Sequence, residues 1–429
     1  MSETNIVTEL DADGILLATI DMPGRAMNVF SRALMDALEA LIDRAQTDAA
    51  VKGVVLTSGK ATFLAGADLE MIRVFTERAK TDTPGQLHDL CGHLGRLFRR
   101  LELGEKPFVA AINGLALGGG LEVCLACHWR VVADDPKIQL GLPEVKLGLL
   151  PGAGGTQRLP RLVGAAAGLR MLLTGEPVAP QEALDLGLVD EVVARDRLIE
   201  VAKHRARTLA APCAPWDRPG ATFSDAPYDF SKDTAAKAIA RDIGVTDEQW
   251  RDYPAYRTIV DCVVGGWKLP MTDASRREMD LFVDLIRDPV AGNMVRTLFL
   301  NRQRAAKAGL LAPDGALANG DDALLPRVKA TRLRAWALDL SDGDRLLAVA
   351  LEAARAWLGG KVSEPELADV AVVAAGHFPA YTGGPFNWLS SEGVAKVREA
   401  ASRAAAAHPD LFELPSGLEK VFTPIQRAA

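Results

Sequence analysis

The sequence predicts an α/β domain followed by a mainly helical C-terminal region. Over roughly the first 200 residues, short apolar runs alternate with segments whose apolar residues recur at helical spacing, which favours an α/β arrangement. Beyond about residue 274, helical spacing dominates. The length of 429 residues agrees with this division, because it suggests two or three domains.

The expected strands of the α/β part are short apolar runs. They cover residues 15–21, 51–57 and 108–113. Between the first two, residues 31–44 carry apolar side chains at helical spacing, and Ser31 is of a residue type that caps helix N-termini. This order predicts a strand, a helix and two further buried strands.

A hairpin is expected after the third strand. Residues 131–133 and 138–140 are two further short apolar runs, and the turn Asp134-Asp135-Pro136 separates them. From residue 165 to residue 209 the pattern becomes predominantly helical.

Changes of composition divide the rest of the chain. Residues 211–228 contain several prolines and indicate a boundary or an irregular crossing, and residues 311–325, rich in Gly, Pro and Asp, indicate a second linker. Helices are expected over 274–308, 344–359 and 365–375. The expected domains are an α/β domain (1–205), a Pro-rich crossing with linker helices (206–310), a linker (311–334) and a helical domain (335–429).

Composition and charge exclude several classes of protein. The net charge of −7 gives no basic field for nucleic acid, so no nucleic-acid partner is expected. Five cysteines in a chain of this length do not indicate a disulfide framework. The N-terminus lacks the pattern of a secretory signal, and no apolar run reaches 18 residues. We therefore expect a cytoplasmic protein without a membrane partner.

The densest chemical signal lies between residues 112 and 144. An apolar strand leads into Gly118-Gly119-Gly120 and then into the mostly apolar run 121–129, which predicts a helix. The first amides of a helix lack internal partners and lie at its positive end, so they can receive a developing negative charge. Glu122 would lie in that first turn. Close backbone packing would explain the same glycines without any chemistry.

A second signal is Glu144, which lies in an otherwise apolar stretch. A carboxylate there is costly unless it is paired or has a raised pKa, and a raised pKa suits a general acid or base. A salt-bridged Glu beside a turn is the alternative. Residues 151–156 follow with a glycine-rich loop that lacks the Lys of a phosphate-binding loop. Residues 63–69, a loop of small residues after the second expected strand, form the third element.

Together, these three elements resemble the signature regions of the crotonase, or enoyl-CoA hydratase/isomerase, superfamily. The stretches are FLAGADL (63–69), NGLALGGGLE (113–122) and LPEVKLGLLPGAGGTQR (142–158), and the resemblance covers about residues 5–205. It implies a crotonase-like spiral of ββα repeats that binds acyl-CoA thioesters.

The resemblance also implies roles for eight residues. Glu122 and Glu144 match the two catalytic glutamates of the hydratases. The matching positions for the oxyanion-hole amides are Ala67 and Gly119, and those for the CoA end of the pocket are Ala65, Gly66, Asp68 and Leu69. Family members that only isomerise double bonds often lack the carboxylate that matches Glu122, so its presence favours hydration.

The remaining residues resemble parts of a larger enzyme. Residues 288–307 are similar to the linker helix of multifunctional fatty-acid oxidation enzymes, and residues 345–389 to their last helical domain, which is the C-terminal domain of 3-hydroxyacyl-CoA dehydrogenase. In those enzymes an NAD-binding dehydrogenase domain lies between the two stretches, whereas here only residues 308–334 do. No GxGxxG motif follows a strand, so no NAD and no dehydrogenase activity are expected.

Other motifs carry no expected chemistry. Cys124, Cys127 and His128 spell a haem-attachment motif, but the two cysteines at helical spacing fit a core face better. No zinc-like spacing occurs, so no metal and no separate cofactor are expected.

With this resemblance, the sequence predicts an enoyl-CoA hydratase that adds water to trans-2-enoyl-CoA to give 3-hydroxyacyl-CoA in fatty-acid oxidation or related acyl-CoA metabolism. Two alternatives stay open: an enoyl-CoA isomerase activity, and a non-catalytic acyl-CoA-binding subunit of a multienzyme complex. The expected ligand is an acyl-CoA thioester, and the expected protein partner is a thiolase or further copies of the same chain in a homo-oligomer.

Overall fold

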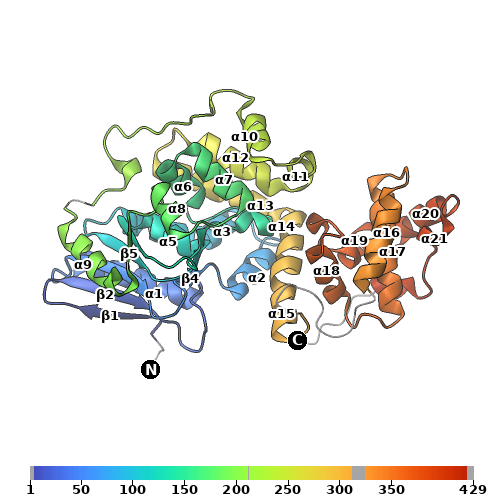
Figure 1. Ribbon diagram of the computed structural model, residues 1–429, viewed down its shortest axis with the longest axis horizontal. Coiled ribbons are helices and arrows are strands. Elements are labelled where there is room, and N and C mark those ends of the chain that lie inside the picture. Colours follow the sequence, from blue (N-terminus) through green and yellow to red (C-terminus); the bar gives the residue numbers. More distant parts are fainter. Residues whose placement is uncertain (1–3, 211, 312–323, 423–429) are drawn as a thin grey trace. The chain divides into compact units, whose positions relative to one another are not determined.

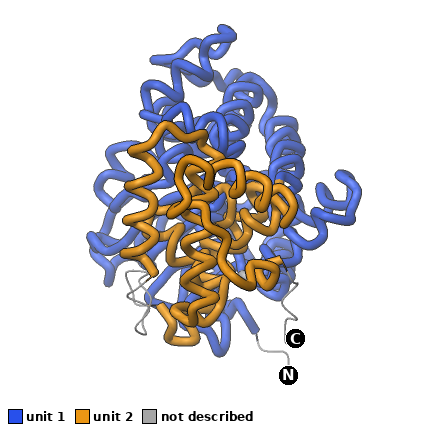
Figure 2. The backbone as a smooth tube through the Cα atoms, turned by 90° about the vertical axis from the view of Figure 1, so that its right-hand side faces the viewer, with its two compact units in different colours: residues 1–288 blue, residues 289–429 orange. Residues whose placement is uncertain are grey.

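The computed structural model describes residues 4–210, 212–311 and 324–422. The chain divides into two compact units, Met1–Asp288 and Pro289–Ala429 (Figure 2). Most of the expected linker over residues 311–325 lies outside the described residues.

The first unit is built on a large, mostly parallel sheet (Figure 1). Its first two strands pair antiparallel, and every later pair is parallel. Within the described residues, the strands in sheet order are β1 (Ile6–Leu10), β2 (Ile15–Ile20), β3 (Gly53–Ser58), β5 (Phe108–Ile112), β7 (Trp129–Ala133) and β9 (Glu191–Val193). All residues of β3 and β5 are buried, as expected for central strands of a covered parallel sheet. The strands expected over 15–21, 51–57 and 108–113 are confirmed.

A second, smaller sheet explains why the expected hairpin is wrong. Strands β4 (Leu64–Ala65), β6 (Ala116–Leu117) and β8 (Leu140–Gly141) pair in parallel, each following a strand of the large sheet. β7 pairs with β5 and β9, and β8 pairs with β6 instead of β7. Each repeat contributes one strand to the large sheet and one to the small sheet. The turn after β7 therefore carries the chain from the large sheet to the small one.

Helices of the first unit complete these repeats. Helix α1 (Arg32–Thr47) begins where expected, since the Ser31 side chain accepts a hydrogen bond from the amide of Leu34 at 3.2 Å. The other helices that follow the strands are α2 (Leu69–Arg78), α3 (Pro84–Cys91), α4 (His93–Glu102), α5 (Gly119–Ala126), the 3-10 helix η1 (Glu144–Leu147), α6 (Gly155–Val163), α7 (Ala165–Thr174), α8 (Pro180–Asp185) and α9 (Leu198–Thr208). Strand β9 lies where the sequence suggested mainly helix. It has three partly buried residues, too few to give a period.

After α9 the chain is irregular through the proline-rich stretch and then forms four helices that belong to the first unit. They are α10 (Ala235–Ile243), α11 (Asp247–Asp252), α12 (Pro254–Gly266) and α13 (Met271–Arg287). α12 packs on α6 and α7, and α13 packs on α3, α6 and α12. These helices therefore cover the part of the unit that follows β8.

Within its described residues, the second unit is helical, as the sequence predicts. It contains α14 (Pro289–Met294), the π-helix η4 (Val295–Asn301), α15 (Arg302–Lys307), α16 (Leu324–Trp336), α17 (Asp342–Leu358), α18 (Pro365–Ala374), α19 (Pro385–Glu392), α20 (Val394–Ala405) and α21 (Pro409–Phe412). Helix α17 is its centre, because α16, α19, α20 and α21 all pack against it. Asp369 of α18 accepts hydrogen bonds from the first amides of α19, including that of Phe386 at 2.7 Å.

The start of α5 requires glycine for packing. Gly118 has φ +55°, a left-handed backbone that favours glycine. At Gly120, a Cβ atom would stand only 2.2 Å from the carbonyl oxygen of Leu64 in β4. The backbone of α5 therefore lies directly against the small sheet, which fixes the helix start.

Replacing Gly120 tests this close approach. Gly120→Ala should lower the free energy of unfolding by about 1–3 kcal/mol, because the added methyl group forces α5 away from β4. The matched control is Gly85→Ala in α3, where a methyl group would meet no atom within 4 Å and alanine should be neutral or stabilising. Chemical denaturation measures both, and equal stabilities of the two variants would contradict the prediction.

Candidate active site

A cavity in the first unit, called here the central cavity, brings together four of the residues that the sequence singled out. Ala67, Gly119, Glu122 and Glu144 all line it. The rest of its wall is mainly apolar. Helices α2, α3, α4 and α13 contribute much of it, with side chains that include Met71, Phe75, Leu90, Leu94 and Phe282, and helix α1 and the loop before α6 contribute further residues. The cavity thus combines two carboxyl groups with space for an apolar group.

Three of the other four predicted residues, Ala65, Gly66 and Asp68, are not among the described residues that line this cavity. Ala65 ends β4, and Gly66 follows with φ +84°. Asp68 caps α2, since its side chain accepts a hydrogen bond from the amide of Glu70 at 2.8 Å, and it also pairs with Arg25. Leu69 begins α2, and its side chain lies outside the described residues.

Two backbone amides on the cavity wall are available to a ligand. Phe30 forms a parallel bridge with Ala67 through the two residues that flank Ala67. The Phe30 amide donates to the carbonyl of Gly66, and the Phe30 carbonyl accepts from the amide of Asp68. Gly119 is the first residue of α5, where amides lack helical partners. In the described part of the chain, neither the Ala67 nor the Gly119 amide donates a hydrogen bond. Both can therefore bind an oxygen with negative charge.

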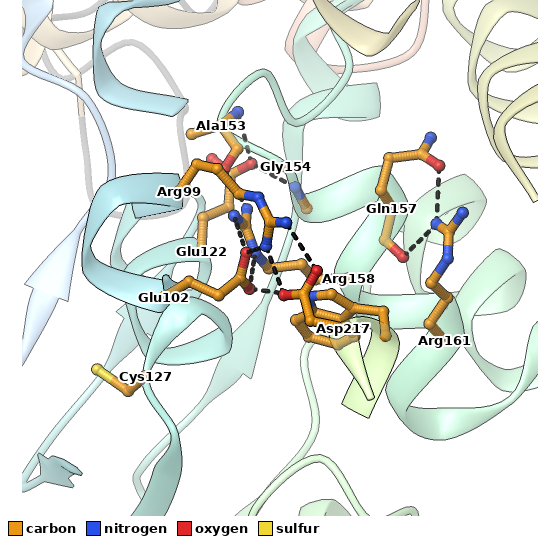
Figure 3. A network of polar contacts seen from close by, with 12 residues as sticks. Arg99, Glu102, Glu122, Cys127, Ala153, Gly154, Gln157, Arg158, Arg161 and Asp217 are labelled. Carbon is orange, nitrogen blue, oxygen red and sulfur yellow. Dashed lines mark hydrogen bonds and ion pairs between the residues drawn. The ribbon is translucent and has the colours of Figure 1, made fainter. Parts of the chain in front are cut away.

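Glu122 is held in the first turn of α5 by the loop before α6. Its side chain is buried, and its Oε1 atom accepts hydrogen bonds from the amides of Ala153 and Gly155, both at 2.8 Å (Figure 3). Gly155 has to be small, because a Cβ atom there would stand 2.8 Å from the same oxygen. The loop thus fixes the orientation of the carboxyl group.

Glu144 has a different environment. It begins η1, and a Cβ atom at Gly118 would lie 2.7 Å from its Oε1, so the glycine makes room for the carboxyl. Among the described residues, its buried Oε2 atom has no hydrogen-bond partner. This carboxyl group therefore has less support for a negative charge than Glu122.

The two carboxyl groups differ in how strongly they hold a proton. Burial raises the pKa of Glu144 well above its usual range, and the neighbouring charge of Glu122 raises it further. Burial also raises the pKa of Glu122, but the amides of Ala153 and Gly155 and the charge of Arg158 oppose that rise. Because the two groups are coupled and Glu122 has more hydrogen-bond support for its charge, a single shared proton is held more strongly by Glu144 than by Glu122.

A buried ion pair supports the loop that holds Glu122. Arg158 in α6 is almost fully buried and donates from Nε to Oε1 of Glu102 at 2.8 Å and from Nη1 to the carbonyl of Ala153 at 2.8 Å (Figure 3). Glu102 also accepts from Arg99, which in turn pairs with Asp217 at 2.6 Å. The ion pair thus links α4 and α6 to the peptide next to Glu122.

Sequence reasoning missed two polar residues of this region, Arg158 and Glu278. Glu278 in α13 is 1% exposed and accepts hydrogen bonds from the amides of Gly154 and Thr156. A signal existed: Ala274, Glu278 and Phe282 follow one another at four-residue spacing, so the sequence places a charge on the apolar face of a helix.

With the geometry described, comparison with known proteins gives the class of protein. Residues 11–216 match the family model described as enoyl-CoA hydratase/isomerase. This part of the chain therefore belongs to the enoyl-CoA hydratase/isomerase family. The family match and the two-sheet architecture confirm the expected crotonase-like fold class with its helical C-terminal region.

Among curated proteins, the chain is similar to fatty acid oxidation complex subunits alpha. The protein of that name from Shewanella frigidimarina is 37% identical over 298 residues, which are 69% of this chain and 41% of the relative. The one from Shewanella sp. (strain MR-4) is 38% identical over 279 residues, 64% of this chain and 38% of the relative. The matched region thus spans about two fifths of these longer relatives.

Solved structures similar to this chain include proteins named for each activity of the family. Enoyl-CoA hydratase from Bacillus halodurans is 22% identical, with 68% of this chain and 99% of that chain covered and a TM-score of 0.49. Human mitochondrial delta3-delta2-enoyl-CoA isomerase is also 22% identical, with 71% and 99% covered and a TM-score of 0.49. In the described residues, no helix has the length and apolar character that crossing a bilayer requires, and no three His, Cys, Asp or Glu side chains are arranged to hold a metal ion.

Removing the buried cation tests the support of the loop. Arg158→Met should lower the free energy of unfolding by about 3–5 kcal/mol, because it leaves Glu102 buried with one charged partner fewer. Arg32→Met, which breaks an exposed pair with Asp36, should cost at most about 0.5 kcal/mol. Denaturant titration of both variants measures the difference, and a loss below about 1 kcal/mol for Arg158→Met would show that the pair is not needed.

Proposed function

We propose that this protein adds water to trans-2-enoyl-CoA to give 3-hydroxyacyl-CoA. One observation carries the proposal: the central cavity joins two carboxyl groups of unlike environment with two unused amides on one wall. An oxygen bound by the amides of Ala67 and Gly119 would stand near both Glu122 and Glu144. The apolar wall would take the acyl chain.

Each group has a chemical task in this reaction. Attack of water on Cβ of the conjugated thioester moves negative charge onto the thioester oxygen. The Ala67 and Gly119 amides, which donate no hydrogen bond within the described residues, would stabilise that charge, and loss of one such donor typically costs about 3–4 kcal/mol. Glu122, whose negative charge is supported by two amide hydrogen bonds, accepts a proton from the attacking water. Glu144, held protonated, delivers a proton to Cα.

This chemistry needs no further group. The base, the acid and the oxyanion-binding amides supply every step, so the reaction as written uses neither a metal ion nor a nicotinamide. One proton leaves Glu144 and one arrives on Glu122 in each turnover, and exchange with solvent restores the starting state. The proposed substrate class is acyl-CoA, and the proposed metabolic process is fatty-acid oxidation. The similarity to fatty acid oxidation complex subunits alpha supports both.

Isomerisation of a 3-enoyl thioester is the second candidate, because the description of the matching family includes both activities. It moves one proton between two carbons and needs only one carboxyl group, whereas the central cavity holds two. One spectrophotometric assay separates the two reactions: hydration consumes the absorbance of the conjugated enoyl thioester, and isomerisation creates it. A protein that binds acyl-CoA and changes neither signal would be a non-catalytic subunit.

Removing the proposed acid tests its role. Glu144→Gln keeps the shape of the side chain but cannot deliver a proton, so kcat should fall by about 10²–10⁴-fold with acyl-CoA binding nearly unchanged. Glu200→Gln in α9, an exposed carboxyl, is the matched control and should retain full activity. Steady-state hydration of crotonyl-CoA measures both, and near-normal turnover by Glu144→Gln would reject the assignment.

The two raised pKa values also predict a bell-shaped pH profile. Hydration should fall as pH drops through the raised pKa of Glu122, because the base becomes protonated, and should fall as pH rises through the raised pKa of Glu144, because the acid is lost. The measurement is kcat/KM of hydration across pH 5–10, roughly the range over which such groups titrate. A profile without an alkaline limb would contradict a protonated Glu144.

A further inference from the structure

Glu278 is a third buried carboxyl group near the proposed acid and base. It comes from α13, far along the chain from the three matched motifs, and is 1% exposed. The surrounding face of α13 is apolar, with Met279 and Phe282 as neighbours. Burying a carboxyl is costly, and an apolar residue of similar size would fill the space without that cost. The contacts of Glu278 should therefore show what its carboxyl group does.

Two carboxyl groups, those of Glu122 and Glu278, accept hydrogen bonds from the loop before α6. The amides of Ala153 and Gly155 donate to Glu122, both at 2.8 Å. The intervening amides donate to Glu278: Gly154 to Oε1 at 2.5 Å and Thr156 to Oε2 at 3.0 Å, and the Thr156 hydroxyl also donates to Oε2. Successive amides of residues 153–156 thus alternate between the two carboxyl groups.

This alternation couples the two side chains through four peptide units. If the hydrogen bonds from Gly154 and Thr156 to Glu278 change, the peptide units that carry the Ala153 and Gly155 amides are displaced as well, because consecutive rigid peptide planes are joined through a shared Cα atom. A displacement of that kind moves the donors that orient Glu122. Glu278 therefore controls the geometry of a carboxyl group that it does not contact.

We propose that Glu278 is a positioning residue for the acid–base pair: it holds residues 153–156 in the arrangement that orients Glu122. A second, electrostatic consequence concerns Glu144. The proposal rests on the hydration reaction proposed above. Glu278 itself contacts no reacting atom in this scheme, so it is not a catalytic residue.

The electrostatic part follows from the groups that face Glu278. Burial and the charge of Glu122 raise the pKa of Glu278 to about 8, against the opposing effect of its hydrogen bonds with Thr156 and Gly154 and of the charge of Arg158. The charge of Glu278 in turn raises the pKa of Glu144. The other titratable or charged groups around it are Arg161 on α6, Cys262 on α12, and His88, Arg96, Arg99 and Arg276, which line a second cavity together with Glu278.

The sign of the effect can be worked out for a neutral replacement. Above about pH 8, Glu278 carries a negative charge that keeps the proton on Glu144. Without that charge, Glu144 loses its proton at a lower pH. Replacing Glu278 by Gln should therefore move the alkaline limb of the hydration profile to lower pH, whereas a purely structural role of Glu278 would leave the limb in place.

The test compares Glu278→Gln with the wild type and with Asp284→Asn, the same carboxyl-to-amide change at an exposed position of the same helix. In Glu278→Gln, the NH₂ group replaces one of the two oxygens that accept from the Gly154 and Thr156 amides. Two donors then face each other, so residues 153–156 should shift. We expect kcat for crotonyl-CoA hydration to fall about 10- to 100-fold with KM nearly unchanged, together with the alkaline shift. Asp284→Asn should match the wild type in both readouts.

The outcomes separate the two proposals. If the wild type does not hydrate enoyl-CoA, the proposed function fails first. If the wild type is active and Glu278→Gln keeps both its kcat and its pH profile, or loses kcat without moving the profile, the positioning role is overturned. Should Glu278→Gln not fold, Thr156→Val replaces it: loss of the hydroxyl donor weakens the charged form of Glu278, so a smaller shift in the same direction is expected, and an unmoved limb would again reject the proposal.

Discussion

The structure depends on the hydrogen bonds that one short loop, residues 153–156, donates to two buried carboxyl groups. The amides of residues 153–156 are the main source of hydrogen bonds for Glu122 and Glu278, and each of these side chains lies where an uncompensated charge would be very costly. Arg158 completes the arrangement from within the first unit by holding the Ala153 carbonyl and pairing with Glu102. Gly155 is therefore needed for space around a carboxyl oxygen of Glu122, and Gly154 for space around the guanidinium group of Arg158.

The carboxyl groups of Glu122 and Glu144 receive different numbers of hydrogen bonds, and they therefore hold a proton with different strength. Glu122 receives two amide hydrogen bonds, whereas Oε2 of Glu144 receives none from the described residues. Since the groups interact, each charge makes the next one harder to form, and the least supported carboxyl keeps its proton. The same cavity thus holds two carboxyl groups of which one, Glu144, keeps its proton more strongly than the other. This difference is a property of the fold around the two residues, because both are the same amino acid.

Much of the first unit was predictable because its signals are local. Buried strands such as β3 and β5 are continuous apolar runs, and Ser31 marks the start of α1 next to the helix it caps. The expected hairpin between residues 131 and 140 was wrong because both strands are short, and pairing with a neighbour in sequence competes with pairing across repeats. Only the contacts of β7 with β5 and of β8 with β6 decide between these pairings.

The sequence by itself determined the α/β character, the motifs that identify the family and the candidacy of Glu122, Glu144, Ala67 and Gly119. These features depend on residue type and short spacing, so they are present before folding. The tertiary structure alone decided that Glu278 from α13 shares a loop with Glu122, that Arg158 is a buried support, and that Ala65, Gly66 and Asp68 lie outside the lining of the central cavity. The physical reason is that hydrogen-bond partners and the cost of burial are set by atoms distant in sequence, which no local pattern specifies.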